Sequence, residues 1–234
     1  MSLTGKLRSP EPSPRAIGLV YLSYALTGAF GAFLLRGIVV SGDATATATN
    51  ILAHQTLYRA GFSFDLAANV LYGILTALFF GFFRHVDRAV STIAGFCGLG
   101  GCTVQIAGEV FRIAPLMILR NASLGAQFSA AQVRTAAIFS LSLHSETIRI
   151  AIVLFAVFDL AVGYLIIRST FVPSVLGALM MVGGAGAMTL LWPPLAVNLH
   201  YVIVPLGGVA ELLLMLWLIL KGSRAVAPAL PAAA

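Results

Sequence analysis

Three sets of polar residues recur at helical spacing inside long apolar stretches of this 234-residue chain. One set is Gly98, Cys102, Gln105, Glu109 and Arg112, a second is Asp65, Asn69, Tyr72 and Thr76, and the third is His200, Val204, Gly207 and Glu211. Steps of three and four residues keep side chains within a narrow sector of a helix that turns about 100° per residue. Each set therefore predicts a polar stripe along one face of an apolar helix.

Carboxyl, amide and guanidinium groups are costly inside a membrane, so they are expected to face protein or water. We expect the three stripes to meet in a polar seam between their helices, with Glu211 facing Glu109 and Gln105. Two adjacent carboxyls do not both ionise cheaply, so at least one is expected to be protonated unless Arg112 or Arg149 approaches. The sequence leaves the protonation of Glu109 and Glu211 open.

The seam has two interpretations. As structural glue, its amide and carboxyl groups bond across helices and hold the bundle together. As a ligand or ion path that opens toward the outer face, the same groups bind or move a small or amphipathic molecule. The residues assigned to this ligand-binding seam are Asp65, Asn69, Tyr72, Gln105, Glu109, Arg112, His200 and Glu211.

A metal centre is a further alternative, and its weak candidates are His54, His144, Glu146 and His200. Such a set could hold zinc with an open position for water, which would make the protein a membrane-embedded metal-dependent hydrolase. No HxxH or HExxH spacing places two of these residues on one helical face, so no metal site is predicted. The facing histidine pairs of a transmembrane cytochrome are also missing. We therefore predict no cofactor and assign no catalytic residue.

The composition places these stripes in a membrane protein. The chain is 59% hydrophobic and 9% charged, and its mean hydropathy is +0.98. A surface of this kind needs lipid to cover it, so membrane lipids are the expected partners. The net charge of +6 comes from single basic residues at the ends of apolar segments, which excludes a nucleic-acid stripe.

The elements that carry the stripes are predicted to be transmembrane helices, because each apolar run is long enough to cross about 30 Å of hydrocarbon. We predict an all-α bundle with six spans: Ala16 to Val40, Phe62 to Phe83, Arg88 to Leu119, Thr147 to Ile167, Phe171 to Trp192, and Asn198 to Leu220. Residues 16–222 form one domain, and residues 1–15 and 223–234 are expected to be disordered cytoplasmic tails.

Two connections on the predicted outer face are longer than a hairpin needs, and both are expected to be amphipathic surface helices. The first covers Ala44 to Arg59, after the turn Ser41-Gly42-Asp43. The second begins at the capping-box sequence Ser129-Ala-Ala-Gln132 and runs toward His144, with a direct junction to the fourth span as an alternative.

The basic residues favour an orientation with both termini in the cytoplasm. For this orientation the inner side carries Lys6, Arg8, Arg15, Arg84, Arg88, Arg168, Lys221 and Arg224. Many of them crowd into short loops, where the positive-inside rule counts most.

Several motifs together resemble one family of bacterial membrane proteins. They are Gly42-Asp-Ala with Thr49-Asn50-Ile51, then Leu57-Tyr-Arg59-Ala-Gly-Phe62 with Phe64-Asp65-Leu66, then Gly163-Tyr-Leu-Ile-x-Arg168-Ser-x-Phe-x-Pro173-x-x-x-Gly177, and Gly208-x-x-Glu211 followed by Trp217-Leu218 and Lys221-Gly222. From about Ala16 to Gly222 the chain resembles the domain of unknown function 4386 family. The resemblance implies a bundle of about six helices in a bacterial inner membrane, without an assigned activity. It favours Arg59, Asp65, Arg168 and Glu211 as important positions.

Three of these positions have structural interpretations. Arg168 and Pro173 bracket the predicted inner turn between the fourth and fifth spans, where arginine anchors at headgroups and proline starts a helix. Arg59 and Asp65 are expected to pair at the entry to the second span. Besides a ligand-binding role, an accessory or assembly subunit of a membrane complex remains an alternative, and its protein partner is not specified by the sequence.

Overall fold

The computed structural model describes residues 12–222, with the side chains of all these residues except 193–204. The helices are α1 (Pro14–Leu35), α2 (Ala44–Ala53), α3 (Gln55–Phe83), α4 (Arg88–Leu119), α5 (Ala122–Gln127), α6 (Ala130–Arg168), α7 (Ser174–Ala187), the 3-10 helix η1 (Met188–Leu191) and α8 (Pro193–Leu220). The described residues contain no β-strand, and the predicted all-α fold is confirmed.

Within residues 12–222, five segments are long and apolar enough to cross a membrane. They are α1, α3, α4, α6, and α7 taken together with η1. Helix α8 adds a shorter apolar segment, Pro205–Leu220. These helices correspond in order to the six predicted spans, so the chain has the architecture of a multi-pass membrane protein.

Side-chain caps explain where several helices begin. The Ser13 hydroxyl accepts a hydrogen bond from the Ala16 amide at 3.2 Å, and Pro14 occupies the first position of α1. Asp43 caps α2 in the same way. The predicted capping box at Ser129 and Gln132 is present, and the helix that it starts continues without a break into the fourth span as α6.

Two predicted boundaries differ from the structure. The surface helix that was expected to reach Arg59 ends at Ala53, because His54 has a non-helical backbone conformation and α3 starts directly after it. The first span was expected to reach Val40 but ends at Leu35, close to Gly37, which has a φ of 81°. Residues 12–15 of the predicted amino-terminal tail are described, and α1 begins among them at Pro14. Residues 1–11 and the predicted carboxyl-terminal tail lie outside the described residues.

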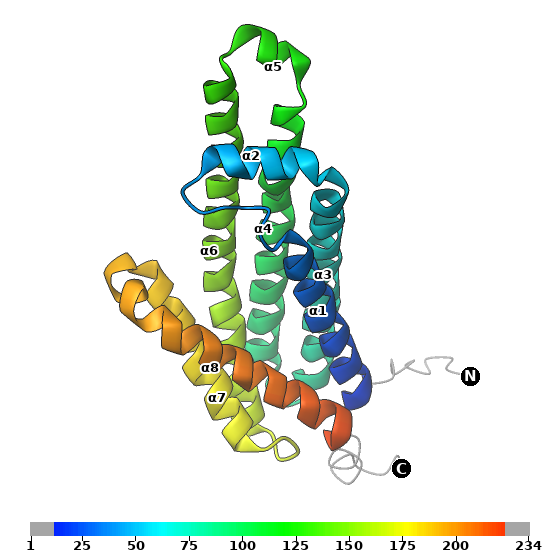
Figure 1. Ribbon diagram of the computed structural model, residues 1–234. Helices are drawn as coiled ribbons and strands as arrows, with labels where there is room; N and C mark the ends of the chain where they lie inside the picture. Colours follow the sequence, from blue (N-terminus) through cyan, green and yellow to red (C-terminus); the bar gives the residue numbers. More distant parts are fainter. Residues whose placement is uncertain (1–11, 223–234) are drawn as a thin grey trace, which may run out of the picture.

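Six helices form a ring in which each contacts the next, in the order α1, α3, α4, α6, α7, α8 and back to α1. Helix α2 lies across one end of this ring against α4 and α6 (Figure 1). At the other end the start of α1 meets the end of α8, where the Arg15 Nε donates to the Ile219 carbonyl oxygen at 3.3 Å. We call the end that α2 covers the α2 end, and the end where α1 begins and α8 stops the terminal end.

Close backbone contacts join α7 to its neighbours. A Cβ built on Gly183 would lie 2.9 Å from the Gly207 Cα on α8, and one built on Gly163 of α6 would lie 2.6 Å from the Gly177 carbonyl oxygen. These positions have room only for glycine, as expected where small residues set helix packing in membranes.

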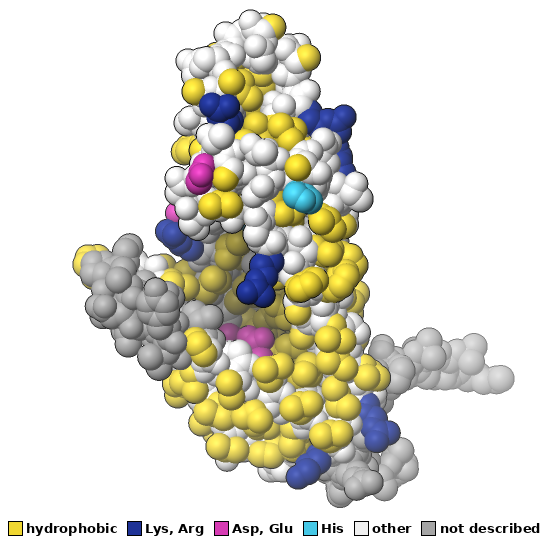
Figure 2. All heavy atoms as spheres, viewed as in Figure 1, with side chains coloured by type: hydrophobic (Ala, Val, Ile, Leu, Met, Phe, Trp, Pro, Cys, Tyr) yellow, Lys and Arg dark blue, Asp and Glu magenta, His cyan; other side chains and the backbone are white. Residues whose placement is uncertain are grey.

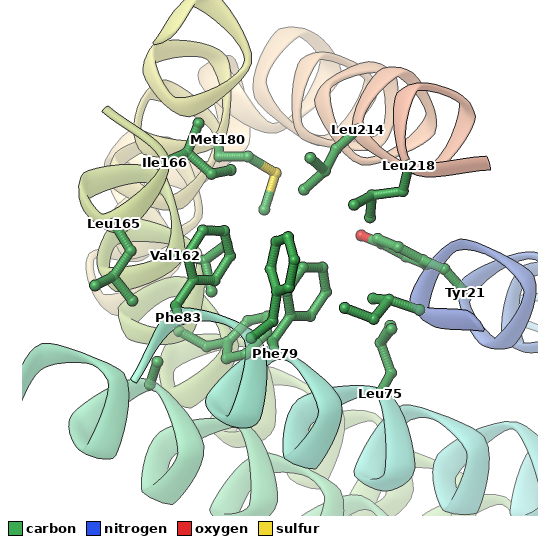
Figure 3. Close-up of a cluster of buried hydrophobic side chains, with 14 of the residues drawn as sticks. Tyr21, Leu75, Phe79, Phe83, Val162, Leu165, Ile166, Met180, Leu214 and Leu218 are labelled. Carbon is green, nitrogen blue, oxygen red and sulfur yellow. The ribbon is translucent and has the colours of Figure 1, made fainter. Parts of the chain in front are cut away.

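The main apolar core lies inside the ring toward the terminal end (Figure 3). Phe79 and Phe83 of α3 stack at its centre with their ring centroids 6.1 Å apart. Leu214 and Leu218 approach from α8, and Tyr21 enters from α1 with its hydroxyl toward α8 (Figure 3). Two of the buried polar residues, Glu109 and His144, lie nearer to the α2 end than this core does.

Helices α4 and α6 are longer than the membrane is thick. Their 32 and 39 residues correspond to roughly 48 and 58 Å, against about 30 Å of hydrocarbon. Joined by α5, they form a helical hairpin that projects past α2 (Figure 1).

Candidate functional site

Arg112 of α4 connects three helices near the α2 end. Its Nη2 lies 2.6 Å from the Asp65 Oδ2 of α3, and its Nη1 lies 2.9 Å from the His144 Nε2 of α6. The Tyr58 hydroxyl of α3 donates a hydrogen bond to the Arg112 carbonyl oxygen. Both charged side chains of the ion pair are about one-fifth exposed, at 21% and 19%, so the pair is only partly screened by solvent.

His144 is held as a neutral ring by its two partners. The arginine donates to Nε2, while the Nδ1 lies 3.2 Å from the Gly108 carbonyl oxygen. Because that carbonyl can only accept, Nδ1 carries the hydrogen and Nε2 accepts. The cluster formed by Asp65, Arg112 and His144 is therefore neutral overall.

Glu109 lies one helical turn from Arg112 and is only 4% exposed. Its Oε2 has no hydrogen-bond partner among the described residues, and the same holds for the Arg112 Nε. Both residues line a cavity of about 290 Å³, together with Tyr24, Gly28, Ala32, Asp65, Ala68, Asn69, Gln105, His144 and Ile148. We call this cavity the polar cavity.

A second buried group of carboxyls lies between α1, α6 and α8. Asp159 of α6 and Glu211 of α8 lie close enough for their charges to influence each other, and the Tyr21 side chain of α1 lines the same cavity as Glu211. The Asp159 Oδ1 is shielded from solvent and has no partner among the described residues. A cavity of about 290 Å³ here is lined by Tyr21, Tyr24, Ala25, Gly28, Ala29, Gly208, Glu211, Leu212 and Met215. We call it the acidic cavity.

Aromatic rings from α1, α3 and α6 pack together beside the two cavities, and we call this group the aromatic layer. The Tyr24 and Tyr72 rings meet edge to face with centroids 4.9 Å apart, and Tyr72 meets Phe155 at 4.8 Å. Tyr24 and Gly28 line both cavities, so the cavities are neighbours along α1.

The two cavities lie at different depths. Counting from the basic residues at the terminal end, Glu211 is ten residues before Lys221 and Asp159 nine before Arg168, or about 15 Å along each helix. By the same count Glu109, 21 residues after Arg88, lies about 32 Å along α4. The acidic cavity is thus near the middle of a bilayer, and the polar cavity is near the interface at the α2 end.

The space-filling view shows a hollow on the face between α1 and α8 (Figure 2). Acidic side chains lie deep within this hollow, and a basic side chain lies at its edge nearer to α2 (Figure 2). The surrounding surface is mainly hydrophobic, as expected for a face in contact with lipid.

The structure places most of the predicted seam residues in one cavity and Glu211 in another. Asp65, Asn69, Gln105, Glu109 and Arg112 line the polar cavity, and Tyr72 is buried in the aromatic layer. Glu211 lines the acidic cavity instead, so its predicted pairing with Glu109 and Gln105 is wrong. The reason is topological: α8 contacts α1 and α7 in the ring rather than α3 and α4. The side chain of His200 lies outside the described residues.

The predicted pair of Arg59 and Asp65 is also wrong, because Asp65 pairs with Arg112. Both residues lie on α3, where six positions turn the helix by about 240° and point their side chains apart. Arg168 and Pro173 occupy their predicted places, at the last residue of α6 and directly before α7.

The metal candidates are not brought together. His54 is exposed beside α2, His144 is bound to Arg112, and Glu146 pairs with Arg149 at 2.9 Å. Within the described part of the chain, no three His, Cys, Asp or Glu residues are grouped so that they could hold a metal ion.

Sequence reasoning missed the contribution of α1 and the role of His144. Tyr21, Tyr24 and Gly28 face the cavities at a spacing of three and four residues, the same signal that revealed the other stripes. Asp159 stood alone in its span, and only the three-dimensional arrangement pairs it with Glu211.

These features define a multi-pass helical membrane protein with polar groups buried inside its ring of helices. The family model described as Domain of unknown function (DUF4386) matches residues 16–222, and the chain belongs to this family. The resemblance seen in the sequence motifs is thereby confirmed. No curated protein and no solved structure matched the chain.

Proposed function

We propose that this protein binds a small or amphipathic ligand in the polar cavity, with the polar part of the ligand at the membrane interface. The observation that carries the proposal is the Glu109 carboxyl, which is 4% exposed and presents an unpartnered oxygen in a cavity. A buried acceptor without a partner costs about 1 to 3 kcal/mol. A ligand that donates a hydrogen bond to it recovers that free energy.

A purely structural role explains the neighbouring residues better than it explains Glu109. Asp65 and His144 are satisfied by Arg112 and tie α3 and α6 to α4. Glu109 adds no such connection among the described residues, and the Arg112 Nε next to it also lacks a partner. A free acceptor and a free donor in one cavity are the arrangement that a polar ligand group requires.

The proposal includes the location of the protein in a bacterial inner membrane, with both termini in the cytoplasm. The α2 end would then face outward, so the polar cavity would lie near the outer interface. The supporting observation is the set of basic residues beside short turns at the terminal end, including Arg84, Arg88 and Arg168.

Photolabelling of the purified protein in nanodiscs tests ligand binding. Three dodecyl amphiphiles share one diazirine-bearing tail and differ in their head group, which is an amine, a glucoside or a carboxylate. We expect at least one of them to label cavity residues such as Tyr24, Ala68 and Ile148, and an excess of its unlabelled form to compete. Mass spectrometry of peptides locates the label.

A leucine at position 28 serves to fill the cavity. A Cβ on Gly28 meets only the Ala68 Cβ at 3.8 Å, so Gly28→Leu is accommodated and should abolish the labelling. Gly73→Leu is the matched control, since its nearest contact is also at 3.8 Å and Gly73 lines neither cavity. Labelling that is confined to the outer lipid-facing surface for all three probes would contradict the proposal.

A further inference from the structure

The acidic residues of the described helices differ in whether an ion pair neutralises them. Asp65 is neutralised by Arg112 at 2.6 Å, and Glu146 pairs with Arg149. Glu109, Asp159 and Glu211 have no ion-pair partner among the described residues. A carboxyl group at membrane depth is expected to pair with another group or to mark the path of a ligand.

We propose that the acidic cavity binds a lipophilic organic cation, whose positive charge is held by Glu211 with Asp159 as a second carboxyl nearby. This inference goes beyond the proposed function, because the acidic cavity is a separate site from the polar cavity. Glu211 supplies a carboxyl that lines the cavity. Asp159 does not line it but adds a second carboxyl close to Glu211, with a buried oxygen that has no described partner. None of the residues that line this cavity is basic.

The walls of the acidic cavity suit an organic cation. Tyr21 and Tyr24 line it with ring centroids 6.2 Å apart. Their faces can attract a cation at about 6 Å or less from the ring. Ala25, Leu212 and Met215 provide apolar contacts for the rest of the molecule. A volume of about 290 Å³ is far larger than a single inorganic ion and is close to the lower limit of pockets for small molecules.

A route from the lipid is present on the same face. The acidic cavity lies between α1 and α8, and the hollow there opens on a hydrophobic surface (Figure 2). At Gly208 an added Cβ would meet no atom within 4 Å, and the adjoining Leu212 is 50% exposed. A lipophilic cation that has partitioned into the bilayer can therefore approach the carboxyls sideways.

Protons and the cation are expected to compete for the two carboxyls. The titratable groups beside them are Tyr21 and Tyr24 of α1, which line the cavity, and Tyr72 of α3, whose ring meets that of Tyr24. Helix α7 has no titratable residue in its sequence, and the side chains of residues 193–204 in α8 lie outside the described part. Two carboxyls at close range share their protons, so a bound cation takes the place of a proton that passes to water.

The experiment uses the full chain in nanodiscs, with tetraphenylphosphonium as the probe and tetraphenylborate as its anionic counterpart of similar size and shape. We expect saturable binding of the phosphonium in equilibrium dialysis and none of the borate. Glu211→Gln and Asp159→Asn keep hydrogen-bonding capacity and fold, and each should raise the Kd at least about tenfold. Glu146→Gln, which alters an exposed pair, should leave the Kd unchanged.

A second measurement needs no variant. Phosphonium binding to the unaltered protein should release about one proton per cation and should weaken as the pH falls. The inference would be overturned if the phosphonium did not bind, or if both probes were retained equally. It would also be overturned if neither carboxyl variant weakened binding, or if binding released no proton. If the dodecyl glucoside labels the polar cavity while the phosphonium does not bind, the proposed function stands and this inference fails.

Discussion

At the scale of single residues, Arg112 has the most partners in the polar cavity. It reaches Asp65 and His144 with its guanidinium and accepts a hydrogen bond from Tyr58 at its carbonyl oxygen. Loss of its charge would leave Asp65 uncompensated at a partly buried position. Its contribution to stability should therefore depend on whether Asp65 is charged.

We expect Arg112→Gln to lower the free energy of unfolding by about 3 kcal/mol, because removal of one partner strands the other. In the double variant with Asp65→Asn, the total loss should be smaller than the sum of the single losses by at least about 1 kcal/mol. SDS titration in mixed micelles, followed by helical circular dichroism, measures these values. The exposed Glu146 provides the control, since Glu146→Gln should cost less than about 0.5 kcal/mol. Strict additivity of the two cavity substitutions would contradict the proposed dependence.

Local spacing was enough to find Asp65, Gln105, Glu109 and Arg112, because residues three and four apart must share a helical face. It could not tell which faces meet. Glu211 lies on an equally clear stripe, yet its neighbours are Tyr21 and Asp159 from helices far away in the sequence. The pairing of stripes depends on the order of helices in the ring, which is a property of tertiary packing.

At the scale of helices, the sequence predicted where a helix begins when a capping residue was present. Ser129 with Gln132 marked the start of α6 correctly. The break at His54 was missed because no Gly or Pro marks it. After Ala44, the first such residue is Gly61. Burial of Tyr58 beneath α2, against Leu116 of α4, helps fix the junction there.

We expect Ser129→Ala to loosen the first turn of α6 by about 1 kcal/mol, since the hydroxyl caps the Gln132 amide. Hydrogen exchange of residues 130–134 should accelerate about fivefold, while the membrane-embedded part of the helix stays protected. The exposed Ser123, for which the described residues provide no capping partner, is the control. Unchanged exchange in this turn would show that the cap contributes nothing.

The contact between α7 and α8 yields a packing prediction. At Gly183 an added Cβ would come within 2.9 Å of the Gly207 Cα, so Gly183→Leu must push the helices apart. We expect a loss of about 2 to 4 kcal/mol in the free energy of unfolding, measured by SDS titration. Gly208→Leu meets open space and should be neutral or slightly stabilising. Equal effects of the two substitutions would disprove the close contact.

At the scale of the whole molecule, the ring places the start of α1 and the end of α8 side by side. The order of the apolar helices was predictable from hydropathy, whereas the orientation in the membrane depends on charges outside the spans. If all six helices cross the membrane, the chain returns to the side on which it entered.

We expect both termini to be cytoplasmic. Alkaline phosphatase fused after residue 234 should be inactive, whereas green fluorescent protein at either end should be fluorescent. Phosphatase fused within the α5 hairpin, at residue 125, should be active as the matched control. An active phosphatase at the carboxyl terminus would overturn the orientation, the number of crossings, or both.

The ion pair between Asp65 and Arg112 also bears on how the chain enters the membrane. These residues lie on consecutive helices that are joined by the short turn between Phe83 and Arg88. Helices α3 and α4 can thus insert as one hairpin that carries its own counter-ion. Asp159 and Glu211 lie on α6 and α8, with α7 between them. Neither carboxyl has a described counter-ion, so we expect insertion of the second half of the chain to depend on protonation of these two groups, whereas Asp65 enters with its counter-ion.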